Sequence, residues 1–475
     1  MGLTRFLMGL AAVAAAAGLA SPASTATLAL LGQSKKVCQL TGQTDWFSGQ
    51  LTNAKTTSRY GLIGVDLGFP VEGEKDQLYF LFGDANPNNH PAGSYPTVPP
   101  DDGLGVTMRT AEPDSADCLD LNFFSPGPGQ LAHPVVTPAI QQGSYNVPTG
   151  GVFSGGRLYA FFWTNHCFLP DAVLPNPTTP LLRPTAPPGS FCPETDASNS
   201  IGHSVLAYST PANPTAFTQT DPPVVVAYVP QMPSGFVYVS ASDPPDELIK
   251  TPGGPPVMGP APYIPVYGVA RFRASIPYLA MAPRATFGAF KTWHFYGGTN
   301  SNGPIWLTYQ QWQSGHIGNQ WAPPPGAELY ADSPNAYSLT GDERCVGEHS
   351  VTWSAALGVW LMSYTCGGLQ VEARTAPKPW GPWSKPTILL SAVQNPGLYC
   401  TLFWNLPGQP CPGLVSQEPA PLTFGYLYAP FLMSRYTKAE LAPGGLAKRA
   451  SVFWLLSTWD PYQVTVMHST LEVTP

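Results

Sequence analysis

The sequence predicts an all-β protein, and more closely a five-bladed β-propeller with Pro-rich loop insertions. Its 475 residues include 56 prolines and 47 glycines, which disfavour long helices because proline removes a backbone donor and glycine is costly in a helix interior. Short apolar segments recur instead, and five units repeat along the chain. Many short strands separated by turns are typical of sandwiches, barrels and propellers, and the repeat favours the propeller.

The strand-like segments are rich in aromatic and branched residues and are bounded by glycine or polar residues. The clearest are DQLYFLFGD (76–84), GRLYAFFW (156–163), GVWLMSYTC (358–366) and SVFWLLSTW (451–459). We expect each of them to be a strand of a buried sheet.

A further strand in each unit ends in small residues and a proline turn. These segments are VTMRTAEP (106–113), SVLAYSTP (204–211), PYLAMAP (277–283), VEARTAP (371–377) and VTVMHSTL (464–471), the last with Leu471 in place of proline. Their markers Thr110, Thr210, Ala282, Thr375 and Thr470 are 100, 72, 93 and 95 residues apart. Such intervals accommodate a four-stranded blade with insertions.

A glycine-containing segment opens each unit. These segments are GVDLGFP (64–70), NVPTGGVF (146–153), VYGVARFR (266–273), GEHSVTW (347–353) and GYLYAPFL (425–432). Innermost strands crowd around a propeller axis, which favours glycine, and their exposed ends line the channel where ligands bind. We therefore expect function on these five segments. The Pro-rich stretches 85–101 and 169–193 are predicted to be surface insertions, with disorder as the alternative.

The N-terminus has the layout of a secretory signal peptide. Arg5 precedes an apolar stretch from 6 to 19, and small residues lead to a predicted cleavage after Ala26. Residues 1–26 would be this signal, and residues 27–475 a single propeller domain, secreted or at the cell surface. A retained membrane anchor is the alternative, which the short apolar run and Pro22 disfavour.

The number and positions of the cysteines agree with the predicted secretion. All eight cysteines follow Ala26, and none forms a CxxC pair, so disulfides are expected and a zinc site is not. The predicted pairs are Cys167–Cys192, Cys345–Cys366 and Cys400–Cys411, which leave Cys38 with Cys118.

The charge balance excludes several kinds of partner. Only 11% of the residues are charged, and 22 Lys and Arg against 29 Asp and Glu give a net charge of −7. This balance gives no excess of basic residues of the kind that binds nucleic acid or an anionic membrane. No P-loop, Rossmann glycine pattern or HExxH motif occurs in a convincing context, so we predict no cofactor. A neutral polysaccharide is the expected partner of a monomeric protein.

Two aspartates stand alone in apolar and glycine-rich surroundings. Asp45 lies in QTDWFSGQ, and Asp66 lies on the first predicted inner strand, GVDLGFP. Burial disfavours the charged form of a carboxyl group, and a second carboxylate nearby separates the two pKa values. Glycoside hydrolysis needs such a pair, one as acid and the other as nucleophile or base. Both residues also fit a turn-forming or capping role.

Other polar residues on the predicted inner strands are candidates for substrate contact. Glu348 would orient substrate or shift the pKa of a neighbouring acid. Arg271 and Arg273 would each pair with an acid or orient a catalytic carboxylate. His349 and Tyr426 are further candidates, and Trp46 and Trp459 are possible stacking platforms. For each of these residues the alternative is a purely structural role within the protein.

Three further polar residues are expected to have structural roles. They are His203, Asp84 at a strand end and Asp460 at a turn.

These fragments together resemble a known family. TDW, GVDLGFP, LYFLFGD, VPTGG, RLYAFFW, HSVLAYS, GVARFRASIPYLA, GVWLMSY, RTAPKPWGPWS and STWDPYQVTVMHSTL occur in the expected order between Asp45 and Leu471. They look like the family, long of unknown function, that forms glycoside hydrolase family 183 and includes bacterial endo-D-arabinanases. The resemblance implies a five-bladed propeller that hydrolyses D-arabinan of mycobacterial arabinogalactan and lipoarabinomannan, with catalytic acids at Asp45 and Asp66. The interval between these two residues is longer than the family pattern.

The sequence therefore predicts a secreted glycoside hydrolase acting on a furanoside polysaccharide, with Asp45 and Asp66 as the carboxylate pair. The competing hypothesis is a non-catalytic carbohydrate-binding or surface-adhesion propeller. A sialidase-type enzyme is disfavoured, because the inner segments offer only Arg271 and Arg273 for a substrate carboxylate.

Overall fold

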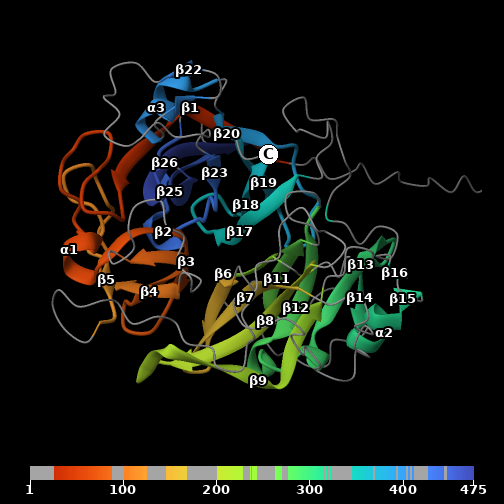
Figure 1. Ribbon diagram of the computed structural model, residues 1–475. Helices are drawn as coiled ribbons and strands as arrows, with labels where there is room; N and C mark the ends of the chain where they lie inside the picture. The colour runs from red at the N-terminus through yellow and green to blue at the C-terminus, as the bar shows by residue number, and fades with distance from the viewer. Residues whose placement is uncertain are drawn as a thin grey trace, which may run out of the picture.

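The strands form five antiparallel sheets that follow one another around a ring in chain order (Figure 1). This arrangement confirms the predicted five-bladed propeller. The computed structural model describes residues 26–87, 101–125, 146–167, 200–227, 236, 238–242, 263–269, 276–314, 316–317, 320–321, 329, 345–366, 370–391, 394–402, 405–406, 409–410, 426–442, 447–459 and 461–474.

The first three blades are built from consecutive strands. Blade 1 contains β2 (Leu62–Glu72), β3 (Leu78–Pro87), β4 (Asp101–Thr107) and β5 (Asn122–Phe123). Blade 2 contains β6 (Asn146–Ser154), β7 (Arg157–Cys167), β8 (Ser200–Thr210) and β9 (Asn213–Ala227). Blade 3 contains β10 (Tyr238–Ala241), β11 (Tyr263–Val269), β12 (Tyr278–Pro283), β13 (His294–Asn300) and β14 (Gly303–Thr308).

The last two blades complete the ring. Blade 4 contains β17 (Val346–Ser354), β18 (Val359–Cys366), β19 (Gln370–Ala376) and β20 (Thr387–Ser391). Blade 5 contains β23 (Tyr426–Tyr428), β25 (Lys448–Trp459), β26 (Gln463–Thr474) and β1 (Thr27–Gln39), and β24 (Lys438–Glu440) also pairs with β25. Outside the blades lie the hairpins β15 (His316–Ile317) with β16 (Gln320–Trp321) and β21 (Asn405–Leu406) with β22 (Gln409–Pro410), and the short helices α1 (Thr56–Tyr60), α2 (Tyr309–Ser314) and α3 (Pro396–Leu402).

The repeat seen in the sequence corresponds to one position in the blades. Its small-residue segments fall at or just after the third strand from the axis, which is β4, β8, β12, β19 or β26. The aromatic segments form the second strands β3, β7, β18 and β25. Sequence periodicity therefore identified the blades correctly.

One predicted inner strand is wrong. The predicted segments of blades 1, 2, 4 and 5 contain the inner strands β2, β6, β17 and β23, but 266–273 belongs in part to β11, the second strand of blade 3. The inner place is taken by β10, which contacts β6 and β17 of the neighbouring blades. Blade 3 has five strands, so the additional strand displaces the glycine-containing one from the axis. Arg271 and Arg273 lie outside the described residues.

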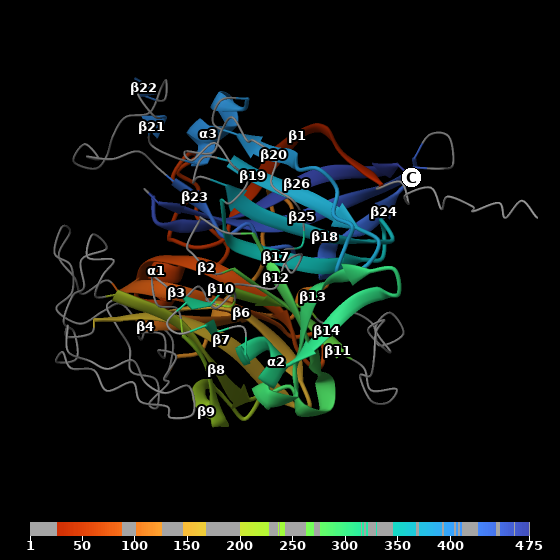
Figure 2. The ribbon, with the colours of Figure 1, turned by 90° about the vertical axis from the view of Figure 1, so that its right-hand side faces the viewer.

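The first strand that the structure describes closes the ring. β1 is the outer strand of blade 5 and pairs antiparallel with β26, in a register from Thr27 opposite Thr474 to Gln39 opposite Thr465. Figure 2 shows β1 beside β26 at this edge of the ring. Backbone hydrogen bonds between β1 and β26 thus complete blade 5, and the chain continues from β1 into blade 1.

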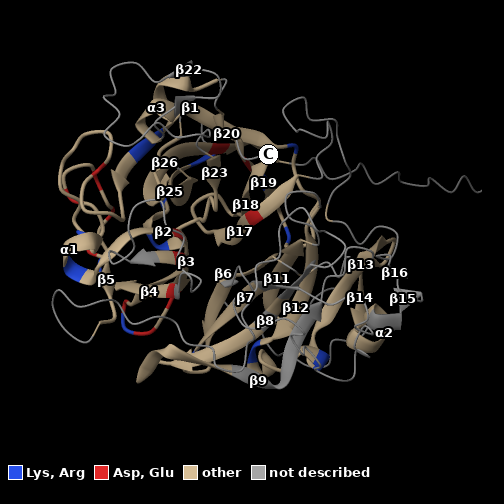
Figure 3. Cartoon of the chain, in the orientation of Figure 1, with Lys and Arg blue, Asp and Glu red and all other residues tan. Residues whose placement is uncertain are grey.

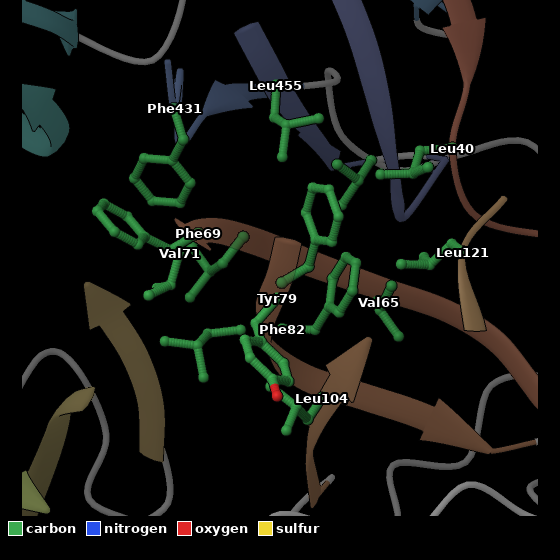
Figure 4. Close-up of a cluster of buried hydrophobic side chains, with 14 of the residues drawn as sticks. Leu40, Val65, Phe69, Val71, Tyr79, Phe82, Leu104, Leu121, Phe431 and Leu455 are labelled. Carbon is green, nitrogen blue, oxygen red and sulfur yellow. The ribbon is translucent and has the colours of Figure 1, made fainter. Parts of the chain in front are cut away.

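The seam between blades 1 and 5 contains a shared apolar core. Figure 4 shows side chains of blade 1, among them Phe69 and Phe82, packed with Phe431 and Leu455 of blade 5. The Phe69 and Phe431 ring centroids are 4.9 Å apart in an edge-to-face arrangement. These side chains belong to one continuous apolar cluster. Each fully buried side chain of this size stabilises the fold by about 1.5–3 kcal/mol relative to an exposed one.

Two of the predicted disulfides are present among the described residues. Cys38 is bonded to Cys118 and Cys345 to Cys366. Cys400 is also disulfide-bonded, while the side chains of its predicted partner Cys411 and of the predicted pair Cys167–Cys192 lie outside the described residues. The Cys38–Cys118 bond joins β1 of blade 5 to the connection between β4 and β5 of blade 1.

Within the described ranges, no helix has the length and apolarity needed to cross a lipid bilayer.

The two disulfides should differ in their contribution to stability. Replacing Cys38 and Cys118 by alanine opens a loop with a sequence separation of 80, whereas Cys345 and Cys366 are separated by 21. Chain entropy predicts losses in the free energy of unfolding of about 4.5 and about 3.4 kcal/mol, respectively. Urea denaturation of both double variants measures which of the two losses in the free energy of unfolding is larger. A larger loss for the Cys345 and Cys366 variant would contradict it.

Candidate active site

Asp66 lies on β2 at an irregular part of the strand. Its Cα partner on β3 is Gly83, and the register shifts both before Asp66 and between Leu67 and Phe69. Leu67 has a φ of 61°, which is rare for a residue other than glycine. Such bulges redirect side chains and are frequent next to active sites. The Asp66 side chain is consequently buried, with 7% of the residue exposed.

Asp84 lies on β3 and was expected to end that strand. The expectation is wrong, because β3 continues to Pro87. The strand accommodates Asp84 through a register shift between Phe82 and Ala85, with an Asp84 φ of 44°. Aspartate tolerates this left-handed conformation better than most residues. The bulge keeps Asp84 within the sheet, one strand away from Asp66.

Glu348 reaches the same region from blade 4. It lies on β17 between Val346 and His349, where the register with β18 shifts, and 8% of the residue is exposed. Its charge raises the pKa of Asp66, which places it near that carboxyl. Figure 3 shows how sparse charged residues are, with acidic positions on blades 1 and 4 bordering the middle of the ring.

The electrostatics of the two aspartates are coupled. Burial, and next the charge of Asp84, raise the pKa of Asp66 well above its usual range. Burial raises the pKa of Asp84 to about 7. Raised pKa values on two neighbouring carboxyls favour the state in which at least one of them is protonated, because the two negative charges repel each other.

Two tyrosines of blade 5 hold the carboxyl of Asp66. The Tyr428 hydroxyl donates to Asp66 Oδ2 at 3.0 Å, and the Tyr462 hydroxyl hydrogen-bonds to the same carboxyl group. Both bonds lower the pKa of Asp66 and partly oppose burial. The sequence prediction missed both residues, although Tyr428 lies only two positions beyond Tyr426.

Glycines beside Asp66 provide the space for this arrangement. A Cβ atom at Gly83 would lie 2.8 Å from Val147 Cγ1 and 2.9 Å from Asp66 Oδ1. One at Gly64 would lie 2.6 Å from the backbone oxygen of Tyr462. Gly64, two residues before Asp66, and Gly83, opposite it on β3, therefore permit close approach by neighbouring groups.

An exposed aromatic group adjoins the acids. Tyr426 and Trp459 are opposite each other on β23 and β25, and they are 39% and 42% exposed. The Trp459 ring packs edge-to-face on Tyr462, with centroids 5.6 Å apart. The structure thus brings two of the predicted binding residues next to a tyrosine that contacts Asp66.

His349 is turned into the protein. It is 2% exposed, its Nδ1 lies 3.0 Å from the carbonyl oxygen of Gly347, and burial lowers its pKa to about 4. The ring is therefore neutral at physiological pH. The side chain of His203, like Asp460, lies outside the described residues.

Asp45 has different surroundings. Its Oδ2 forms an ion pair with Lys36 Nζ at 2.7 Å, and its Oδ1 accepts hydrogen bonds from the backbone of Phe47 and Ser48. The charge and hydrogen bond of Lys36, with hydrogen bonds from Ser48, outweigh burial and lower the pKa of Asp45.

Lys36 belongs to β1, three strands outward from the β23 strand whose Tyr428 holds Asp66. Three strand spacings amount to roughly 14 Å. Neither aspartate is among the groups that shift the pKa of the other. Next to Asp45, the Trp46 indole donates to the carbonyl oxygen of Thr401 at 3.1 Å.

Among the residues that the structure describes, no group of three or more His, Cys, Asp or Glu side chains is arranged to hold a metal ion.

Part of the chain matches a family model. Residues 257–468, just under half of the chain, match a domain of unknown function, DUF4185. This match covers β11 to the middle of β26 and assigns no activity. No curated protein matches the chain.

Solved structures resemble the chain only distantly. A Bacteroides ovatus protein provisionally named a hydrolase is 11% identical, with 88% of each chain covered and a TM-score of 0.45. A Trypanosoma rangeli sialidase is 8% identical, with 93% of this chain and 59% of that one covered and a TM-score of 0.33. A Dyadobacter fermentans protein of unknown function is 8% identical, with 87% and 96% covered and a TM-score of 0.32. At these values the likenesses carry no functional argument.

Gly83→Ala tests the space beside Asp66. The added methyl group would meet Val147, Leu67 and Asp66 at 2.8–2.9 Å, so we expect a loss of about 1–3 kcal/mol in the free energy of unfolding. Gly397→Ala is the matched control, because a Cβ atom there meets nothing within 4 Å and alanine favours helix α3. Chemical denaturation compares the two variants. An equally stable Gly83→Ala variant would refute the crowding.

Asp84→Asn tests the raised pKa of Asp84. The folded-state pKa of about 7 exceeds the unfolded value of about 3.9, so this group's stabilising contribution is present below pH 4 and lost as the pH rises through 7. Asparagine does not titrate and tolerates the same backbone conformation. The stability of the variant relative to wild type should therefore increase from pH 4 to pH 8.

Asp117→Asn provides a control of opposite sign. A hydrogen bond from Arg109 lowers the pKa of Asp117, so the stability of that variant relative to wild type should fall as the pH rises from about 2 to about 5 and should stay nearly constant above that. Denaturation at several pH values measures both trends. A flat or falling difference for Asp84→Asn would refute the assigned shift.

Proposed function

We propose that the protein is a glycoside hydrolase whose catalytic carboxyls are Asp66 and Asp84. The observation that carries this proposal is the coupled pair itself: two aspartates on adjacent strands near the propeller axis, with pKa values raised mainly by burial. Raised and coupled carboxyl pKa values are characteristic of acid–base catalysis by enzymes. Glu348 adds to the negative potential that keeps a proton on the pair.

The pair supplies both functions that glycosidic cleavage needs. The protonated carboxyl donates its proton to the glycosidic oxygen, so that the bond from this oxygen to the anomeric carbon breaks with a neutral alcohol as leaving group. The ionised carboxyl acts as nucleophile at the anomeric carbon or as base toward a water molecule. Addition of water across the bond completes the hydrolysis, and no other reactant is required.

The aromatic neighbours support a carbohydrate substrate. Tyr426 and Trp459 are both more than one third exposed, and aromatic rings offer apolar faces with a polar edge to a ligand. The acids beside them favour a neutral substrate, because a carboxylated one would be repelled. These contacts are proposed to hold the sugar next to the acid pair.

The substrate class rests on the sequence resemblance. We propose a furanoside polysaccharide, with D-arabinan of mycobacterial-type arabinogalactan or lipoarabinomannan as the first candidate, and a protein that is secreted or at the cell surface. Disulfide bonds among the described residues are compatible with an extracellular location. Product analysis by mass on arabinan, galactan and arabinogalactan tests the substrate.

A non-catalytic carbohydrate-binding propeller is the second candidate. Tyr426 and Trp459 alone would support it, since exposed aromatic residues can retain a polysaccharide without cleaving it. It predicts retention on insoluble polysaccharide without release of reducing ends. The raised pKa values favour catalysis, because binding alone does not need them.

Substitution of the acids decides between the possible carboxylate pairs. Asp66→Asn and Asp84→Asn should each lower kcat by about 100-fold or more, since each removes one acid–base group. Asp45→Asn should retain most of the activity, because the ion pair with Lys36 holds this carboxylate elsewhere. Reducing-end release from D-arabinan measures all three.

Loss of activity in Asp45→Asn with an unchanged melting temperature would instead favour the pair suggested by the sequence. Full activity in Asp66→Asn would overturn both pairs.

A further inference from the structure

The position of Asp66 depends on a hydrogen bond that crosses the seam between the first and last blades. Asp66 belongs to β2 of blade 1, whereas Tyr428 belongs to β23 of blade 5. The Tyr428 hydroxyl lies 3.0 Å from Asp66 Oδ2, and Tyr428 is 6% exposed. Water therefore does not compete freely for this bond, and its geometry is fixed by two packed strands.

Tyr462 approaches the same carboxyl from the connection between β25 and β26. Its main chain and ring pass over Gly64, where a Cβ atom would lie 2.6 Å from the Tyr462 backbone oxygen and 3.0 Å from its Cδ1. Its hydroxyl hydrogen-bonds to Asp66. Two donors from blade 5 thus act on one acid of blade 1.

Both tyrosines remain protonated donors over the working pH range of an enzyme. Burial is the main cause that raises the pKa of each hydroxyl well above 10, and the negative charge of Asp66 adds to it. A phenol that keeps its proton can donate a hydrogen bond to a carboxylate but cannot itself supply a base. Their effect is exerted through Asp66.

The second oxygen of Asp66 is oriented differently. Oδ1 is buried and accepts no hydrogen bond from any residue that the structure describes. It faces Gly83, whose missing side chain leaves the space beside it. The hydrogen bonding is therefore one-sided, and it fixes the carboxyl with Oδ1 turned toward Gly83.

We propose that Tyr428 and Tyr462 are positioning residues that hold the carboxyl of Asp66, Tyr428 through Oδ2, and so fix its orientation and its proton affinity. This inference rests on the proposed glycoside hydrolase function and identifies residues that act through its central acid. Neither tyrosine touches the glycosidic bond, so their removal changes the orientation and proton affinity of Asp66 and leaves the carboxyl group itself in place.

The test compares Tyr428→Phe and Tyr462→Phe with wild type. Phenylalanine keeps the ring and deletes the donor, so the carboxylate form of Asp66 loses stabilisation and its pKa rises. We expect an increase of roughly one pH unit in the titration midpoint of Asp66, followed by NMR of the carboxyl carbon in substrate-free, aspartate-labelled protein. The Asp66→Asn variant identifies the resonance.

Catalysis provides the second readout. The limb of the pH profile of kcat/KM that reports Asp66 should shift by a similar amount to higher pH, and kcat should fall by about 10-fold or more while KM changes little. Tyr436→Phe is the matched control: it deletes another hydroxyl of blade 5, which donates to the carbonyl oxygen of Arg109 at 2.8 Å, away from Asp66. This control should leave the titration of Asp66 and the pH profile unchanged.

The outcomes separate the two proposals. An unchanged Asp66 midpoint in both tyrosine variants, with the fold intact by circular dichroism, overturns the positioning role even if the protein hydrolyses arabinan. A raised midpoint in a protein that cleaves no glycan supports the positioning of Asp66 and refutes the hydrolase function. If one tyrosine variant does not fold, the other decides the question alone.

Discussion

Antiparallel pairing of β1 with β26 is the interaction on which the rest of the molecule depends. It joins residues 27–39 to residues 465–474 and so makes the last blade from both ends of the chain. With blade 5 closed in this way, its apolar side chains pack against blade 1, and its tyrosines reach Asp66. The ring closure and the acid site are therefore one structural feature, because the site lies across the seam that the closure creates.

The chemistry of the site arises from irregular strands in a chain with few charges. Asp66, Asp84 and Glu348 each lie where a β-ladder changes register, and bulges direct the side chains of such residues away from the regular alternation. Few other charges are available to screen or neutralise them, since only 11% of the chain is charged. Burial then dominates, and it raises the pKa values of Asp66 and Asp84 above those of exposed carboxyls.

The fold could be predicted from the sequence because each blade repeats the same order of segments, whereas the site was only partly predictable. Asp66 and Glu348 were recognisable as isolated acids on glycine-containing inner strands. Asp84 was assigned a structural role because a bulge leaves no clear sequence signal, and Tyr428 resembles any aromatic core residue.

Asp45 has the same isolated appearance in the sequence as Asp66, but Lys36, nine residues earlier, pairs with it. The extra strand β10 in blade 3 lacks the glycine that marked the other inner strands.

The pairing of β1 with β26 also sets an order of events during folding. β1 precedes the other described strands in the sequence and its partner β26 follows them, so this contact has a very large sequence separation and forms late. Until then β1 has no strand partner, and an unpaired strand edge is prone to association with other chains. Asp66 likewise lacks Tyr428 and Tyr462 until blade 5 exists. An incompletely folded chain therefore carries an incomplete acid centre, and the proposed hydrolytic activity would report that the whole ring has formed.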